Sequence, residues 1–197
     1  MNDRNNLFPV FLKLEELDTL IVGGGNVALE KVQALLKSSP MATITLVAPE
    51  IRNEIRQLSV GNRRLHLVER NFRVRDLQRK DLVILATDNH SLHIRIRTLA
   101  RKKRVLINVA DTPELCDFYL GSIVTKGHIK IGISTNGKSP TIAKRLREYF
   151  EEILPDDTSD LLDKMQKIRK TIKGEFREKV RALNEITSGW LERSKTE

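Results

Sequence analysis

The amino-acid sequence predicts an α/β protein: an N-terminal Rossmann-type parallel sheet, followed by a small β dimerisation region and a C-terminal helical domain. Short β-rich apolar runs alternate with amphipathic helical runs from the N-terminus onward. A glycine-rich turn directly follows the first apolar run, and the alternation stops after Pro113. We therefore place the three regions at 1–112, 113–147 and 148–197.

The first region contains the elements of a parallel sheet covered by helices. Strands are expected where the apolar runs are rich in β-branched residues: 19–24, 43–48, 64–70, 81–87 and 105–111. Helices are expected where apolar residues recur at helical spacing: 27–38, 50–59 and 91–103. Strands that alternate with helices imply right-handed crossovers and a mainly parallel sheet.

The second and third regions follow different patterns. The segment "FYLGSIVTKGHIKIGIST" (118–135) predicts two strands around a Lys-Gly turn. Because a small hairpin cannot bury its apolar face alone, we expect it to pair with a second subunit in a homodimer. Beyond it, helices are expected at 141–154, 159–173 and 175–193.

Composition narrows the class of protein. No run approaches the roughly 18 apolar residues that span a bilayer, and the N-terminus lacks the pattern of a signal peptide. A single cysteine excludes an internal disulfide framework and a cysteine metal cluster. We expect a soluble, cytoplasmic protein without a membrane partner.

The net charge of +9 favours a polyanionic partner, either nucleic acid or a small molecule with several carboxylates. Nucleic-acid binding usually adds stacking aromatic residues to a basic patch, yet aromatic residues make up only 5% of the chain. We therefore expect no nucleic-acid partner.

The glycine-rich turn predicts a dinucleotide site. Gly23, Gly25 and Ala28 form a G-x-G-x-x-A pattern, with Gly24 inside it, between a strand and a helix. Gly23 permits a tight turn, Gly25 leaves room for a pyrophosphate, and Ala28 allows helix and strand to pack closely. The amides of Asn26 and Val27 then face the phosphates. The alternative is a glycine-rich turn that binds nothing.

The strand expected at 43–48 lacks the acidic residue that usually contacts the ribose. Pro49 and Glu50 follow it, and the Glu50 side chain or the Pro49–Glu50 backbone can take that contact. Arg52 would instead favour a 2′-phosphate. We favour NAD over NADP as the cofactor.

Two further segments lie at strand ends, where open parallel sheets bind ligands. "ATDN" (86–89) places Thr87 and Asp88 there as cofactor contacts, and "NVAD" (108–111) places Asp111 there as a catalytic candidate. Asp88 has an alternative role in capping the next helix, and Asp111 one in stabilising a turn.

The loop "STNGKSP" (134–140) is a candidate substrate site. Ser134, Thr135 and Lys138, with the N–H groups that begin the next helix, can receive a carboxylate. The alternative is a helix start capped by Ser139 beside an incidental lysine.

Two other candidates are weaker. His90 and His93 share a helix face, but no third metal ligand is in view, so we favour a surface or packing role and predict no metal site. Cys116 lies in no local basic cluster, so we interpret it as structural rather than nucleophilic.

Five segments together resemble the precorrin-2 dehydrogenase family, which also forms the N-terminal portion of siroheme synthase. They are "FPVFLKLEELDTLIVGGGNVALEKV", "VAPE", "ATDN", "NVADTPELCDF" and "ISTNGKSPTIAKRLRE". The resemblance extends in order from Phe8 to about Leu154. It implies NAD-dependent oxidation of precorrin-2, a tetrapyrrole, to sirohydrochlorin in siroheme biosynthesis. It also implies a homodimer.

The resemblance assigns roles to individual residues. The family's essential aspartate falls on Asp111. Its cofactor contacts fall on Gly23, Gly25, Asn26, Val27, Pro49 and Glu50, and the family binds NAD without the usual acidic residue. One departure is that relatives often have S-S-G-G where this chain has Ser134-Thr135-Asn136-Gly137.

Two alternative functions remain open. Some members of the family also insert ferrous iron into sirohydrochlorin, and we favour the dehydrogenase alone. An NAD-sensing regulatory domain would share the glycine turn but would not need Asp111 or Lys138.

Overall fold

The computed structural model describes residues 4–155, 158–171 and 176–187. The chain divides into two compact units. We call Phe8–Leu120 the sheet unit, and Gly121–Glu197 together with Met1–Leu7 the hairpin unit.

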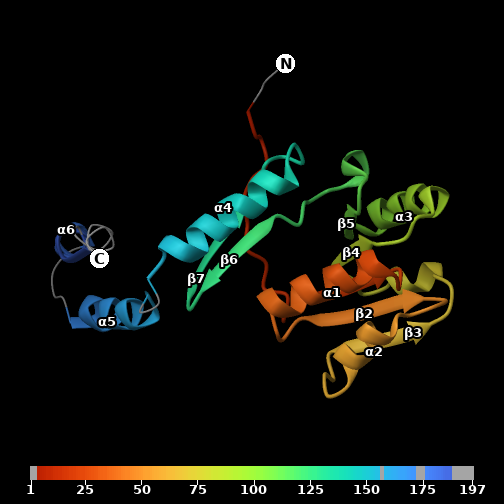
Figure 1. The fold of residues 1–197 in the computed structure, drawn as a ribbon, viewed down its shortest axis with the longest axis horizontal. Helices are drawn as coiled ribbons and strands as arrows, with labels where there is room; N and C mark the ends of the chain where they lie inside the picture. The colour runs from red at the N-terminus through yellow and green to blue at the C-terminus, as the bar shows by residue number, and fades with distance from the viewer. Residues whose placement is uncertain (1–3, 156–157, 172–175, 188–197) are drawn as a thin grey trace. The chain divides into compact units, whose positions relative to one another are not determined.

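The sheet unit contains a five-stranded, fully parallel sheet with the strand order β3-β2-β1-β4-β5 (Figure 1). The prediction of a parallel Rossmann-type sheet is therefore confirmed. The strands are β1 (Asp18–Val22), β2 (Thr43–Ala48), β3 (Leu65–Glu69), β4 (Leu82–Leu85) and β5 (Leu106–Val109).

Three helices and two 3₁₀ turns connect the strands: α1 (Asn26–Ser38), α2 (Asn53–Ser59), α3 (His90–Lys103), η1 (Val74–Leu77) and η2 (Pro113–Leu115). The prediction that a helix begins at residue 50 was wrong. The backbone N–H of Arg52 instead donates to the carbonyl of Gly24, and Ile51 is buried, so the chain is held extended until Asn53.

The two faces of the sheet carry separate apolar cores, because successive strand residues point to opposite faces. Ile21 and Ile84 belong to the core that also includes residues of α1 and α2. Leu20 and Leu85 belong to the opposite core, which includes residues of α3. All four side chains are essentially inaccessible to solvent. The central strands therefore form a rigid frame for the loops at their ends.

In the hairpin unit, the antiparallel strands β6 (Ser122–Lys126) and β7 (Ile129–Ile133) form a two-stranded sheet. Three helices follow: α4 (Pro140–Ile153), α5 (Thr158–Thr171) and α6 (Phe176–Thr187). Helix α4 packs on the hairpin and buries Ala143, and Val124 of β6 is also buried. The end of the helix expected to reach residue 193 lies outside the described residues.

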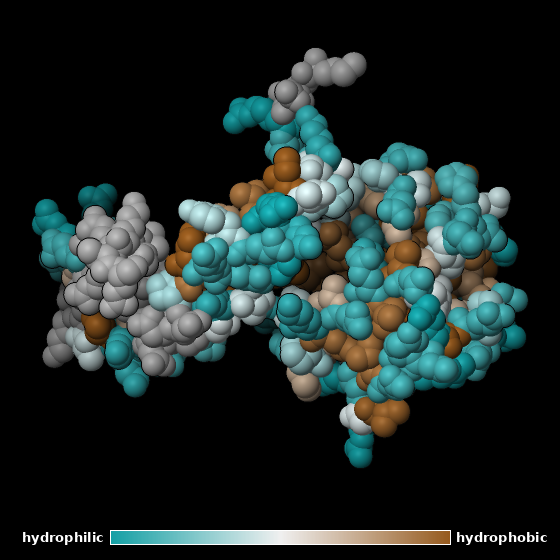
Figure 2. Space-filling view, in the orientation of Figure 1, coloured by the Kyte–Doolittle hydropathy of each residue, from teal (hydrophilic) through white to brown (hydrophobic). Residues whose placement is uncertain are grey.

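Part of α4 carries apolar side chains that remain exposed among the described residues of its unit. The exposed residues are Ile142, Leu146, Tyr149 and Ile153. Figure 2 shows apolar surface over this helix. Across the described ranges, no helix combines the length and the apolar character needed to cross a bilayer.

Candidate functional site

The candidate site lies within the sheet unit, where the direction of the strand order reverses. From β1 the chain continues through α1 to β2 on one side, whereas β4 lies on the other side of β1. The loops after β1 and β4 consequently diverge at the carboxyl edge of the sheet. Such switch points are where open α/β sheets bind ligands.

The first two glycines of the turn are required by packing. Gly23 has φ +127°, and a Cβ atom placed there would lie only 2.3 Å from the carbonyl oxygen of Ala86. A Cβ atom on Gly24 would lie 2.1 Å from the carbonyl oxygen of Glu50. Any larger residue would therefore separate the β1 turn from the segments that follow β4 and β2.

Gly25 differs from its neighbours because a Cβ atom there would meet nothing within 4 Å. It is the N-cap of α1, no side chain caps this helix, and its first turn carries no acidic residue. The turn thus holds open space in front of helix N–H groups that need acceptors. These features fit a pyrophosphate, with the amides of Asn26 and Val27 as its donors.

A hydrogen bond joins Arg52, in the segment after β2, to Asn26 at the start of α1. The Arg52 guanidinium donates to the Asn26 side-chain oxygen at 2.6 Å, and it also forms an ion pair with Glu54. The side chains of Pro49 and Glu50 are exposed at the end of β2. The guanidinium is therefore already shared between two oxygen-bearing partners of its own chain.

Thr87 and Asp88 lie after β4, on the other side of the glycine turn. A Cβ atom on Gly23 would lie 3.2 Å from Cγ2 of Thr87, so Thr87 lies against this turn. The helix-capping alternative for Asp88 does not hold, because Asn89 caps α3 by accepting from the N–H of Leu92 at 2.9 Å. The Asp88 side chain is exposed at the same edge.

Asp111 lies on the neighbouring strand at the same edge. It follows Val109 by two residues, and the register partner of Val109 is Leu85, which Thr87 follows by two residues. Its φ of +56° is a left-handed conformation, which aspartate tolerates better than most residues. The Asp111 side chain is exposed at this edge in the chain as described.

The segment after Asp111 closes the outer edge of β5 by contacts that the sequence did not reveal. Asp117 accepts the backbone N–H of Ile107 at 3.1 Å and forms an ion pair with the nearly buried Arg97 of α3 at 2.5 Å. The Cys116 thiol accepts from the N–H of Val109 at 3.2 Å. Burial raises the pKa of this thiol, which favours the structural interpretation of Cys116.

His93 is not on the protein surface. It is only 4% exposed, and its Nε2 lies 2.9 Å from the Thr87 hydroxyl. The ring centroids of His90 and His93 are 6.4 Å apart. Across the described segments, no three or more His, Cys, Asp or Glu side chains group closely enough to hold a metal ion.

The predicted substrate residues belong to the hairpin unit, and their hydroxyls already have local partners. The Thr135 hydroxyl accepts the backbone N–H of Ser139 at 3.2 Å, and the Ser134 hydroxyl accepts that of Asn136 at 3.2 Å. Ser139 caps α4 by accepting from the N–H of Ile142. The backbone of Lys138 closes the same turn onto Thr135.

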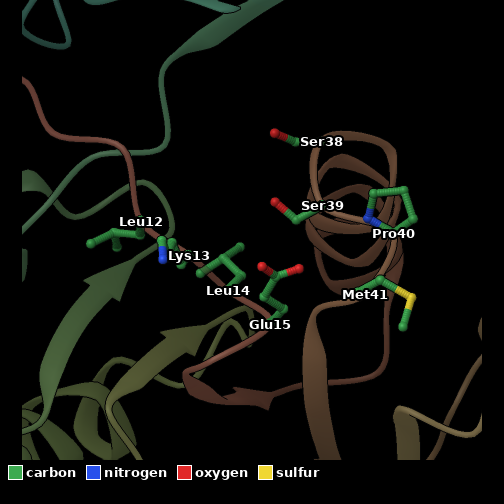
Figure 3. Close-up of a pocket in the computed structure, with 8 residues that line it drawn as sticks. All are labelled: Leu12, Lys13, Leu14, Glu15, Ser38, Ser39, Pro40 and Met41. Atoms are coloured by element: carbon green, nitrogen blue, oxygen red, sulfur yellow. The ribbon is translucent and has the colours of Figure 1, made fainter. Parts of the chain in front are cut away.

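A groove of about 240 Å³ occupies the opposite end of the sheet unit. Figure 3 shows its two walls, Leu12–Glu15 on one side and Ser38–Met41 at the end of α1 on the other. It lies at the C-terminal end of α1, where the helix presents carbonyl groups rather than N–H donors. The groove is therefore unsuited to the phosphates that the glycine turn fits.

This fold and site define a dinucleotide-binding protein of the Rossmann class. Residues 10–122 match a family model described as "Putative NAD(P)-binding", and residues 126–152 match one described as "Sirohaem biosynthesis protein central". The chain therefore belongs to the family described as "Putative NAD(P)-binding", and the second match agrees with the resemblance to siroheme-synthesis enzymes that its sequence motifs had indicated.

Individual relatives agree with this assignment. The chain is 39% identical to a siroheme synthase of Pseudoalteromonas atlantica, over 86% of its own length and 36% of the relative's. It is 36% identical to one of Psychrobacter cryohalolentis, over 94% and 34%. The chain thus spans about a third of these curated relatives.

A solved structure shows the same fold. The structure of SirC, precorrin-2 dehydrogenase, matches with a TM-score of 0.71 at 23% identity, covering 91% of this chain and 89% of SirC. At this identity the match supports the fold, including the small antiparallel sheet and the helices after it.

Proposed function

We propose that this protein catalyses the NAD-dependent oxidation of precorrin-2 to sirohydrochlorin. The observation that carries the proposal is the uncapped start of α1 at Gly25, where a Cβ atom would meet nothing within 4 Å, at the sheet edge where β4 and β5 lead into Thr87 and Asp111. The siroheme synthase relatives and the SirC fold support the tetrapyrrole as substrate. When bound, the nicotinamide cofactor accepts the hydride.

The residues of the chain perform the remaining tasks. Gly23, Gly24 and Gly25 bring the backbone close to the pyrophosphate, and the N–H groups of Asn26 and Val27 hold it. The exposed carboxylate of Asp111 accepts the proton that leaves with the hydride. The cofactor is bordered at the end of β2 by Pro49 and Glu50. At the end of β4 it is bordered by Thr87 and Asp88.

The protein's preference is for NAD. A 2′-phosphate would need a free cation beside the adenine ribose. Arg52, the nearest candidate, is held by Glu54 and Asn26. Replacing Glu54 by Ala removes one of the two partners of the guanidinium, and we expect NADPH to gain a few-fold in affinity relative to NADH.

Asp111→Asn tests the proposed reaction. Asparagine tolerates the left-handed backbone and keeps the size of the side chain but cannot accept the proton. Anaerobic turnover of precorrin-2, followed by sirohydrochlorin absorbance, should fall on the order of a hundredfold or more while NADH affinity stays unchanged. Full turnover in this variant would eliminate Asp111 as the base.

The matched control for that experiment is Glu114→Gln, which removes an exposed carboxylate three residues away. Its turnover should equal that of the wild type.

Adding ferrous iron after the oxidation separates a dehydrogenase from a bifunctional enzyme. Only the bifunctional enzyme converts sirohydrochlorin to siroheme faster than the protein-free rate.

We also propose that Ser134, Thr135 and Lys138 bind substrate carboxylates.

The functional form that we propose is a homodimer. The exposed apolar residues of α4 support the dimer, because Ile142, Leu146, Tyr149 and Ile153 repeat with the 4-3-4 spacing of a helix–helix seam. Tyr149→Lys should halve the mass measured by light scattering. Glu152→Gln, an exposed change on the same helix, should leave it unchanged.

A further inference from the structure

His93 is a buried polar side chain to which the proposed reaction assigns no task. It lies in the first turn of α3, and its Nε2 is 2.9 Å from the Thr87 hydroxyl oxygen. Its other ring nitrogen, Nδ1, is buried and has no hydrogen-bond partner among the described residues. Burying a ring nitrogen without a hydrogen-bond partner costs free energy of folding.

The missing partner of Nδ1 determines where the proton of the ring lies. Burial lowers the pKa of His93, so the ring is neutral, and a neutral imidazole donates from one nitrogen and accepts at the other. A buried N–H without an acceptor is rarer in proteins than an under-used acceptor. The proton therefore lies on Nε2, which donates to Thr87.

The Thr87 hydroxyl receives a second hydrogen bond from the backbone N–H of Asn89, at 3.3 Å. A hydroxyl oxygen has two lone pairs and one proton. His93 and Asn89 donate to the two lone pairs of the Thr87 oxygen. The hydroxyl can therefore interact with a ligand only by donating its proton in a hydrogen bond. Thr87 is half-exposed and lies against the Gly23 turn, at the edge of the dinucleotide site.

We propose that His93 is a positioning residue that holds the Thr87 hydroxyl as a hydrogen-bond donor toward an oxygen of the bound dinucleotide, in its pyrophosphate–ribose portion. This inference rests on the proposed nicotinamide cofactor. His93 would thus contribute to dinucleotide binding through Thr87, without itself contacting the ligand.

The test measures binding of NADH and of ADP-ribose, which lacks the nicotinamide ring, with no turnover required. Thr87→Val keeps the shape and removes the hydroxyl, and both ligands should bind about tenfold more weakly. His93→Leu should weaken both about threefold, because the hydroxyl is then free to rotate. His93→Gln, whose side-chain amide can donate from a similar position, should bind within twofold of the wild type.

The double variant Thr87→Val with His93→Leu separates positioning from a general structural role. If His93 acts only through Thr87, the double variant should bind like Thr87→Val alone. Additive losses, or an unchanged affinity in His93→Leu, would overturn the inference. Thermal melts of each variant establish that it is folded before its affinity is compared.

An independent readout is the ¹⁵N signature of the His93 ring by NMR, which distinguishes the two neutral forms. A proton on Nδ1 would contradict the proposal whatever the affinities. The outcomes also separate this inference from the proposed function. A wild-type protein that binds neither ligand refutes both, whereas one that binds NADH without oxidising precorrin-2 refutes only the proposed reaction.

Discussion

Helices α1 and α4 begin in opposite ways, although each follows a turn that contains glycine. The start of α4 is complete in itself: Ser139 caps it, Pro140 occupies its first position, and Thr135 bonds to the backbone of Ser139. The start of α1 has a glycine N-cap without a side-chain cap. Helix starts left open in this way have N–H groups available for an anion.

Helix α3 lies between these two cases. The Asn89 side chain caps it by accepting one N–H, that of Leu92, yet the same loop presents Thr87 toward the glycine turn. A capped helix start stabilises the fold, whereas an uncapped one beside a close-packed glycine turn is shaped for a ligand. Substitutions at the three starts should therefore separate stability from binding.

The largest effect is expected at Gly23. In Gly23→Ala the new Cβ would meet the Ala86 carbonyl at 2.3 Å in a left-handed backbone, so the β1 and β4 loops must separate. We expect a loss of about 3 kcal/mol or more in the free energy of unfolding. Urea denaturation measures it. A variant as stable as the wild type would show that the turn does not require glycine.

Gly25→Ser should do the opposite, because its side chain enters open space and can cap α1. The free energy of unfolding should rise by a few tenths of a kcal/mol. NADH affinity should fall about tenfold, because the hydroxyl takes an N–H that the phosphate needs. Gly25→Ala, which adds no cap, is the control for stability. Unchanged NADH binding in Gly25→Ser would refute the assignment of this gap.

Ser139→Ala removes the cap of α4 and should lower the free energy of unfolding by about 1 kcal/mol. NADH affinity should remain that of the wild type, since α4 serves stability in this comparison. Calorimetry and fluorescence titration measure the two quantities. A change in NADH affinity would mean that the two helix starts are not functionally separate.

The smallest effect concerns pH and His93. Burial lowers the pKa of His93, and His90 lowers it further, whereas the bond to Thr87 and the charge of Asp88 oppose this. Below about pH 6.5 the unfolded chain binds a proton that the native ring does not, so stability falls as the pH falls.

His93→Gln should remove that contribution, which is at most about 1.4 kcal/mol per pH unit. Unfolding free energies of the two proteins should diverge between pH 7 and pH 5. Parallel pH profiles would show that His93 is as readily protonated in the native state as in the unfolded one.

Patterns within one element were predictable from the sequence. The parallel sheet followed from alternating strand and helix patterns, and the glycine turn followed from Gly23, Gly25 and Ala28, because local spacing encodes both. The Ser139 cap of α4 is a local pattern of the same kind. The start of α2 was predicted too early because the bond from Arg52 to Gly24 connects residues 28 positions apart.

Contacts between elements appeared only in the tertiary structure. The sequence by itself determined the fold class and the dinucleotide turn, since both depend on residue types at fixed short spacing, and its place at a strand end together with the family resemblance made Asp111 a catalytic candidate. The strand order then brought the segments that carry Thr87 and Asp111 to neighbouring strand ends, and packing of the elements directed Arg52 to Asn26 and joined Arg97 to Asp117. These pairs depend on which strands and helices become neighbours, and packing of the two cores decides that.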